Sequence, residues 1–183
     1  MKTHRGNQRR GAAALGLALG LLLAVLAAGS ALGSGSGGIG PGGGAGTPGS
    51  DDGVFPLRGH HTYGDGFGAG RDHEGQDLMT DCGRAVLAAY AGRVQVRDYH
   101  AAAGNYVVID GEGKLLDTAY MHLREPAKVR KRERVEAGDV IGRVGQTGDA
   151  TACHLHFEIW SQPGWYEGGH ALDPEPYLRA WDR

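Results

Sequence analysis

The chain has 183 residues and a formal net charge of −2, but the charge is unevenly divided. Residues 1–50 hold four of the 19 Lys and Arg residues and no Asp or Glu, so residues 51–183 carry 15 basic and 21 acidic side chains. Phosphate contacts need clustered Lys and Arg, which makes this acidic part a poor candidate for a nucleic-acid-binding protein. The dense basic run at 130–134 is interpreted as a solvated loop or strand edge.

The N-terminal segment, residues 1–31, has the pattern of an export signal. A basic stretch, Met1–Arg10, precedes an uncharged run rich in Ala and Leu, and small residues follow at Ala27–Ala31. The run is also long enough for an uncleaved membrane anchor, since about 20 apolar residues span a bilayer. Its many Gly and Ala residues favour the signal peptide. We therefore expect an exported protein that contacts the membrane only through a possible uncleaved anchor.

Residues 32–53 are mostly Gly, Ser, Pro and Ala. Such a segment cannot bury enough apolar surface to offset its ordering entropy, and it is expected to be a disordered, flexible linker. The folding unit is then about 54–183, the usual size for one domain, and we expect it to be a monomer.

The apolar residues of this domain alternate with polar ones in short runs separated by glycine. We expect an all-β domain of antiparallel sheet, because no segment keeps a helical apolar period. The Gly111-Glu112-Gly113 stretch predicts a hairpin turn. Strands are expected around Val94–Val96 and at 105–110, 115–123, 140–144 and 154–160, and one short helix near 174–179.

The segment 154–160 carries two histidines with one residue between them. On a strand, His154, His156 and Glu158 point to one face, and the intervening apolar side chains point to the core. Two imidazoles about 7 Å apart on one face are placed to work together. The spacing does not say which of them binds a metal.

A second group of candidate ligands lies at 73–77. If this segment is extended, His73 and Asp77 share a face, and Gly75 leaves room between them for a third group or a metal. His and Asp supply nitrogen and oxygen ligands for zinc. Gly75 and the flanking glycines argue against a helix here.

A third histidine, His122, lies in the segment 120–123. Strict alternation predicts that Met121 and Leu123 face the core, and that Tyr120 and His122 face the other side. Together the three segments suit a zinc hydrolase, since catalytic zinc has three protein ligands and an open position. The other imidazoles can then move a proton or bind a developing oxyanion. The remaining domain histidines are interpreted as exposed loop residues, namely His60, His61, His100 and His170.

Over about 55–178 the sequence resembles the lysostaphin/LytM-type zinc endopeptidases of peptidoglycan. Their HxGxD motif matches 73–77, their Tyr-x-His-Leu motif matches 120–123, and their HLHFE motif matches 154–158. The run at 105–107 and the glycine-spaced segment 138–148 also match. These motifs occur in the family's order and at family-like spacing.

The resemblance implies roles that the residues alone leave open. It implies that His73, Asp77 and His156 bind Zn²⁺, that His154 is a catalytic residue usually drawn as the general base, and that His122 stabilises the tetrahedral intermediate. It also implies a compact antiparallel fold of the duplicated-hybrid-motif type, with zinc in a groove between loops. The domain would then be a cell-wall or envelope metalloendopeptidase that cuts peptidoglycan stem peptides or cross-bridges.

One position departs from part of the family. Glu74 follows the first ligand where members that cleave glycine bridges often carry Tyr, which argues against a pentaglycine substrate. Some members have lost ligands and activate other wall hydrolases, so a noncatalytic zinc-containing regulator is the alternative function. The complete set of ligands and catalytic histidines favours the enzyme.

The two cysteines, Cys82 and Cys153, lie near the metal motifs. Because both motifs must converge on one ion, and because disulfides persist in exported proteins, we predict a Cys82–Cys153 disulfide. Two free thiols are the plainer alternative. Cys153 as a zinc ligand is the third, but its side chain would face away from that of His154 on a strand.

Overall fold

A computed structural model describes residues 53–70, 72–111 and 116–183. The expected signal peptide or anchor, and all of the expected linker except Gly53, lie outside the described residues. Among the residues that are described, no helix has the length and apolar character needed to cross a bilayer.

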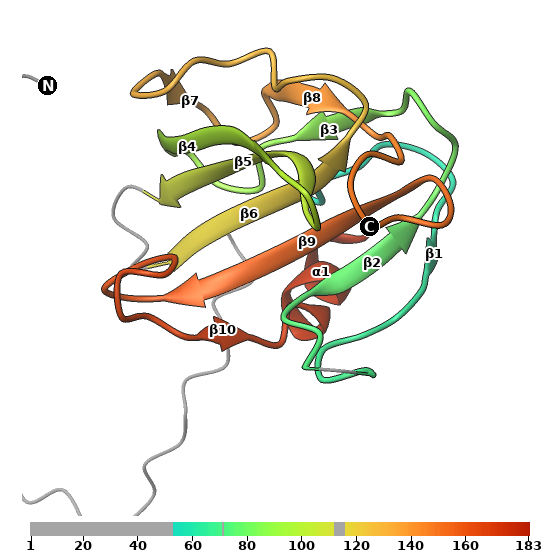
Figure 1. The fold of residues 1–183 in the computed structure, drawn as a ribbon. Helices are drawn as coiled ribbons and strands as arrows, with labels where there is room; N and C mark the ends of the chain where they lie inside the picture. Colours follow the sequence, from blue (N-terminus) through green and yellow to red (C-terminus); the bar gives the residue numbers. More distant parts are fainter. Residues whose placement is uncertain (1–52, 71, 112–115) are drawn as a thin grey trace, which may run out of the picture. The chain divides into compact units, whose positions relative to one another are not determined.

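The described chain is built from antiparallel strands, as predicted (Figure 1). The main sheet has eight strands in the order β1-β2-β9-β6-β5-β4-β7, with β10 beside β9, and β3 pairs with β8 in a second sheet. The strands are β1 (Thr62–Tyr63), β2 (Gln76–Met79), β3 (Ala85–Leu87), β4 (Gly92–His100), β5 (Gly104–Gly111), β6 (Leu116–Leu123), β7 (Arg134–Val135), β8 (Val140–Arg143), β9 (His154–Ser161) and β10 (Ala171–Leu172). The helix α1 (Glu175–Trp181) lies behind the main sheet in Figure 1.

The longer elements agree with the sequence prediction. β4, β5, β6, β8 and β9 each cover an expected run within a few residues, and α1 begins one residue after the expected start. β5 and β6 pair as the predicted hairpin requires, although residues 112–115 of its turn lie outside the described chain. No sequence pattern marked β1, β3, β7 or β10, because strands of two or three residues are too short to show a period.

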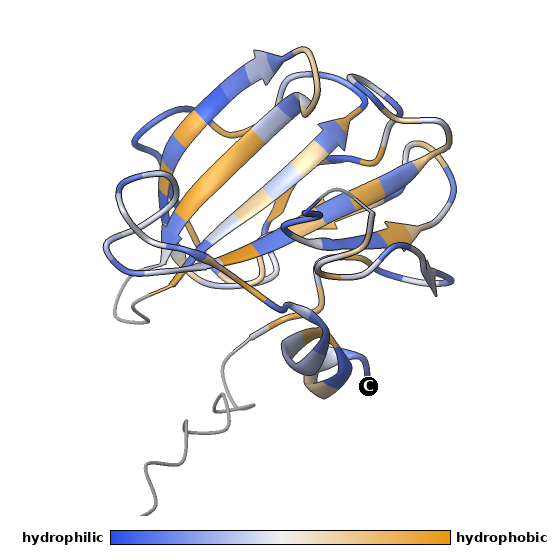
Figure 2. Cartoon of the chain, turned by 60° about the horizontal axis from the view of Figure 1, so that its bottom comes forward, coloured by the Kyte–Doolittle hydropathy of each residue, from blue (hydrophilic) through white to orange (hydrophobic). Residues whose placement is uncertain are grey.

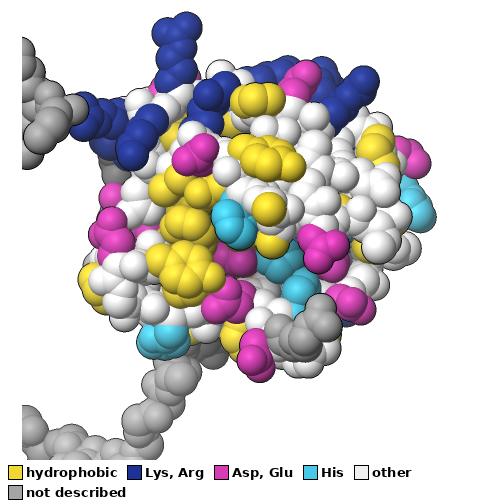
Figure 3. Space-filling model, viewed as in Figure 1, with side chains coloured by type: hydrophobic (Ala, Val, Ile, Leu, Met, Phe, Trp, Pro, Cys, Tyr) yellow, Lys and Arg dark blue, Asp and Glu magenta, His cyan; other side chains and the backbone are white. Residues whose placement is uncertain are grey.

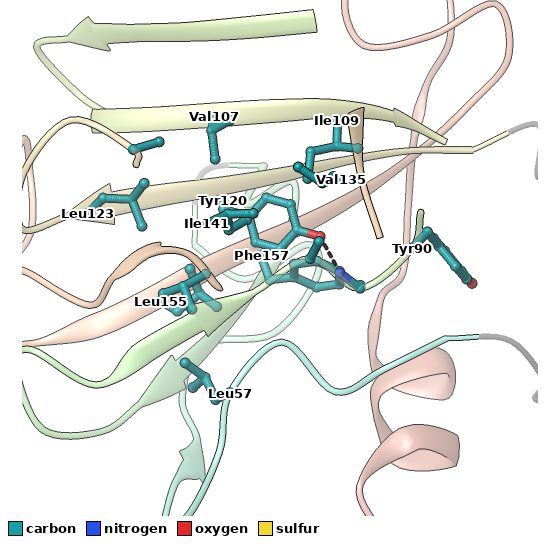
Figure 4. Close-up of a cluster of buried hydrophobic side chains, with 14 of the residues drawn as sticks. Leu57, Tyr90, Val107, Ile109, Tyr120, Leu123, Val135, Ile141, Leu155 and Phe157 are labelled. Atoms are coloured by element: carbon teal, nitrogen blue, oxygen red, sulfur yellow. Dashed lines mark hydrogen bonds between the residues drawn. The ribbon is translucent and has the colours of Figure 1, made fainter. Parts of the chain in front are cut away.

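The main core lies between one face of the large sheet and the layer formed by β3, β8 and α1. On β9, Leu155, Phe157 and Ile159 face this core and are fully buried, as the alternation predicted. Figure 2 shows the same alternation as hydrophobic and hydrophilic bands along the strands. Tyr120 lies at the centre of the core, where its hydroxyl accepts a hydrogen bond from the Ala89 amide (Figure 4).

The orientation predicted for the end of β6 is partly wrong. Tyr120 faces the core instead of the opposite side, and Met121 packs on that opposite side. Leu123 and His122 face as expected. The cause is a β-bulge, since two residues of β6 stand opposite one of β5 and His122 has a φ of +59°. A bulge redirects side chains locally, so Met121 and His122 both reach the same face.

Candidate metal centre

The centre of the site is the pairing of β2 with β9. The Cα atoms of Asp77 and His156 are direct antiparallel partners, which brings two distant motifs face to face. His156 Nδ1 lies 3.0 Å from Asp77 Oδ1. The contact therefore follows from strand register, with no contribution from a flexible loop.

His73 reaches the same carboxylate from the loop before β2, so it is not part of the strand. Its Nδ1 donates a hydrogen bond to the Gly66 carbonyl at 2.9 Å, and its Nε2 lies 3.1 Å from Asp77 Oδ1. A Cβ at Gly75 would lie 2.7 Å from His156 Nε2 and 2.5 Å from the Phe157 carbonyl oxygen. The glycine between the two motif residues thus leaves room for a third group, and that group is His156.

These three side chains form a possible metal site. Each of His73, Asp77 and His156 offers one ligand atom, and these atoms lie within 4.8 Å of one another. Two imidazole nitrogens and one carboxylate oxygen are a donor set that zinc accepts, and three protein ligands leave a fourth position open. The residues present therefore fit a catalytic zinc ion.

Two further histidines face the same space. His154 precedes His156 on the same face of β9, and its Nδ1 donates to the Ala152 carbonyl at 2.9 Å. His122 Nδ1 donates to the Thr147 carbonyl at 2.8 Å. The ring centroids of His122 and His154 are 4.6 Å apart. The structure thus brings together all five residues that the sequence predicted for the site.

The five side chains line one groove of about 790 Å³. In Figure 3 the histidines lie in the middle of one face of the molecule, with acidic and hydrophobic side chains around them. The basic run at 130–134 is exposed and continues into β7 at an edge of the sheet, as predicted. The other groove residues are Asp65, Asp72, Glu74, His100, Ala102, Ala103, Tyr106, Met121, Asp149, Thr151, Glu158, Trp165 and Tyr166.

Comparison with known proteins places this arrangement in a family. The model of peptidase family M23 matches residues 71–174, more than half of the chain, and this range contains all five site residues. The chain belongs to peptidase family M23. The lysostaphin/LytM resemblance drawn from the motifs is thereby confirmed.

The match covers only part of the length of the curated relatives. The chain is 39% identical over 87 residues to the peptidoglycan DD-endopeptidase ShyB of Vibrio cholerae serotype O1, which covers 48% of this chain and 20% of that protein. The chain thus spans about a fifth of that relative's length.

Solved structures agree on the fold. The catalytic domain of the antimicrobial peptidase lysostaphin from Staphylococcus simulans is 29% identical with a TM-score of 0.59, covering 65% of this chain and 92% of that one. A zinc-containing peptidase from Vibrio cholerae is 31% identical with a TM-score of 0.57, and the match covers 65% of this chain and 37% of that one.

In the M23 site, burial and neighbouring charges shift the pKa values of the buried side chains in opposite directions. Burial disfavours the charged form of Asp77, but the hydrogen bond from His156 and the nearby imidazoles outweigh it and lower its pKa. Burial likewise disfavours a charged His156, but its hydrogen bonds to Asp77 and Glu158 raise its pKa to about 9. Burial lowers the pKa of His122, which favours a neutral ring at pH 7.

The predicted disulfide is present in the M23 domain. Cys82 and Cys153 are bonded across 71 positions of sequence, with Cα atoms 5.2 Å apart. The bond joins the chain just beyond β2 to the residue before His154. It therefore fastens the two strands that bring Asp77 and His156 together.

Sequence reasoning missed several residues of the groove. Trp165 and Tyr166 come from the loop after β9. His100, expected in a loop, is exposed as expected but is the last residue of β4, and it also lines the groove. Their sequence neighbourhoods contain no motif or period, so no local signal marked them. The interpretation of His61 as exposed was also wrong, because its ring stacks on Phe55 and its side chain is 12% exposed.

Proposed function

We propose that this chain is a zinc-dependent endopeptidase that hydrolyses peptide bonds in peptidoglycan, in stem peptides or cross-bridges. One observation carries the proposal: three metal-ligand side chains and two further imidazoles converge on one open groove. A site that only stored a metal would not need the second pair of histidines over the same space. The complete set also disfavours the alternative of a noncatalytic regulator.

The proposed zinc ligands are His73, Asp77 and His156. His73 Nδ1–H donates a hydrogen bond to the Gly66 carbonyl, which leaves Nε2 for the metal. His156 presents Nδ1 to Asp77. Zinc bound there would supply Lewis acidity and lower the pKa of water to about 7. The zinc-containing peptidase of Vibrio cholerae supports this choice of metal.

The remaining histidines are assigned to the chemistry. In both His122 and His154 a backbone carbonyl accepts a hydrogen bond from Nδ1, which leaves Nε2 to exchange a proton over the groove, and Nε2 of His154 lies 3.7 Å from Asp77 Oδ1. In our proposal His154 accepts the proton of the attacking water as general base. His122 takes up a proton at Nε2 from solvent and then donates to the oxygen that becomes negative in the tetrahedral intermediate.

The substrate assignment rests on chemistry and on relatives. The groove opens to solvent beside the aromatic side chains of Tyr106, Trp165 and Tyr166, which suits an extended peptide. ShyB, the similar protein from Vibrio cholerae, is a peptidoglycan DD-endopeptidase. The basic and apolar leader and the disulfide favour an exported protein, secreted or associated with the cell envelope.

Digestion of purified sacculi tests the proposal. The purified protein should release muropeptides that mass spectrometry identifies, and a chelator or the substitution His156→Ala should reduce the release to background. His170→Ala is the matched control, because His170 is exposed and does not line the groove. Unchanged products from His156→Ala would contradict a zinc peptidase. Release only in the presence of a second wall hydrolase would favour the regulator.

A further inference from the structure

Glu158 lies beside the metal site and is 3% exposed. We propose that Glu158, held by two tryptophans, is a positioning residue that keeps the proton of His156 on Nε2 and so leaves Nδ1 for the metal. The inference rests on the zinc ligands proposed above, but not on the peptidase reaction.

The contacts of Glu158 use both of its oxygens. Oε1 lies 3.0 Å from His156 Nε2. Oε2 accepts hydrogen bonds from the indole nitrogens of Trp160 at 2.7 Å and Trp165 at 3.1 Å. His156, Glu158 and Trp160 lie at alternate positions of β9 and therefore share the groove face, whereas Trp165 folds back from the loop that follows.

The two indoles occupy one oxygen of the carboxylate. An indole N–H only donates, so Oε2 accepts twice and Oε1 is left to face His156. An imidazole is a stronger base than a carboxylate, so a proton shared between Nε2 and Oε1 belongs to Nε2. Oε1 is then also an acceptor, and the short contact with His156 requires a proton on Nε2. The opposite tautomer would set two lone pairs against each other at 3.0 Å in a buried site.

The consequence appears on the other side of the ring. With one proton held on Nε2, the nitrogen that gives up its proton to a metal is Nδ1, which lies 3.0 Å from Asp77 Oδ1. Once Nδ1 has lost that proton, two electron-pair donors face each other, and a shared cation satisfies both of them. Histidine ligands commonly give their other N–H to a carboxylate, which orients the ring and raises its basicity.

Trp165 links this carboxylate to the wall of the groove. Its backbone amide donates to Asp117 Oδ2 at 2.9 Å, which anchors the loop to β6. Its ring lies 5.7 Å from that of Tyr106 and 4.7 Å from that of Tyr166, both groove residues. The side chain is therefore held from several directions, and its indole N–H is directed inward at Glu158.

Zinc affinity of the full chain tests the proposal by competition with a chromophoric chelator. Glu158→Gln should weaken zinc binding by roughly 10- to 100-fold, the usual effect of removing such a partner. The Gln amide cannot accept from two indoles and from His156 without turning a donor toward one of them. Trp165→Phe should give a smaller loss of affinity. Trp181→Phe, a tryptophan packed on Tyr90 in the core, should leave the affinity unchanged.

Nitrogen-15 NMR of the zinc-loaded native protein supplies a readout that needs no variant to fold. It should show His156 protonated at Nε2 and unprotonated at Nδ1. A folded Glu158→Gln protein with zinc affinity within about threefold of native, or a native His156 protonated at Nδ1 in the zinc-loaded state, would overturn the proposal. A native protein that binds no zinc would instead overturn the metal centre itself.

Discussion

The two halves of the groove hold their histidines by different kinds of partner. In the metal half (His73, Asp77 and His156), each imidazole has a ring nitrogen within 3.1 Å of one carboxylate oxygen. In the imidazole half (His122 and His154), each Nδ1 donates instead to a neutral backbone carbonyl, at 2.8 and 2.9 Å. All five side chains nevertheless line one groove.

The difference in partners separates binding from proton transfer. A carboxylate stabilises positive charge on its neighbours, so the metal half favours a cation, as the raised pKa of His156 shows. A carbonyl orients a ring without adding charge. Burial then lowers the pKa of His122 and keeps it available to gain a proton. The hydrogen-bond partner of each histidine thus decides whether it suits metal binding or proton transfer.

The strongest test of this comparison removes each imidazole of the second half. His154→Ala and His122→Ala should each lower kcat by roughly 10²- to 10⁴-fold, the usual contribution of a general acid or base. Both variants should keep the zinc content of the native protein, because neither residue belongs to the metal half. Turnover of a cross-linked muropeptide and metal analysis of the same preparations provide the two measurements. Loss of zinc from His154→Ala would mean that the division is wrong.

The Cys82–Cys153 bond fastens the chain beyond β2 to the start of β9, so its removal tests how much the bond stabilises the fold that carries both halves. Replacing both cysteines with Ser should lower the free energy of unfolding by about 2–5 kcal/mol, the usual range for a native disulfide in a small exported domain. Urea denaturation measures the change. Reductant should destabilise the native protein by a similar amount and leave the double variant unaffected. A double variant as stable as the native protein would contradict the structural role.

The hydrogen bonds of His156 to Asp77 and Glu158 also predict how zinc binding depends on pH. His156, with a pKa raised to about 9, carries a proton at pH 7 in the metal-free protein, and zinc must displace it. Affinity should therefore rise about tenfold per pH unit below pH 9, or roughly 100-fold from pH 6 to pH 8. The raised pKa has the opposite effect on the metal-free fold, whose extra stability is complete below pH 6.5 and is lost toward pH 9. Calorimetry at several pH values measures both trends, and zinc affinity independent of pH would contradict them.

Asp77 and His156 of the metal half were the more predictable residues, because they lie on regular strands, whereas His73 lies in the loop before β2. Alternation on β9 correctly separated His154, His156 and Glu158 from Leu155 and Phe157. The choice of His156 over His154 as ligand came only from the family resemblance, and the structure adds that His156 lies opposite Asp77. Register between distant strands is a tertiary property that a short motif does not contain.

His122 of the imidazole half depends on irregular backbone, which explains what the sequence missed. The bulge at His122 places a non-glycine residue at a φ of +59°, and no local pattern predicts this. It reversed the expected directions of Tyr120 and Met121. Trp165 similarly reaches the groove through a loop whose path follows long-range contacts such as that with Asp117.

The smallest expected effect lies at the rim of the metal half. The Tyr166 hydroxyl donates to Glu74 Oε2 at 2.8 Å, and Glu74 directly follows His73. Burial and this hydrogen bond both raise the pKa of Tyr166, so the phenol remains a donor at neutral pH. Because Tyr166 is 65% exposed, Tyr166→Phe should weaken the free energy of substrate binding by only about 0.5–1.5 kcal/mol, the net value of one hydrogen bond.

That cost should appear as a rise in KM of no more than about tenfold, with kcat and zinc content unchanged. The reason is that the Tyr166 hydroxyl bonds to Glu74 in the wall of the groove. It makes no hydrogen bond to any of the four histidines or the aspartate of the site. Tyr99→Phe, an exposed tyrosine of β4 outside the groove, is the matched control. A large fall in kcat for Tyr166→Phe would show that the rim helps to place His73. The boundary of the metal half would then have to include the loop after β9.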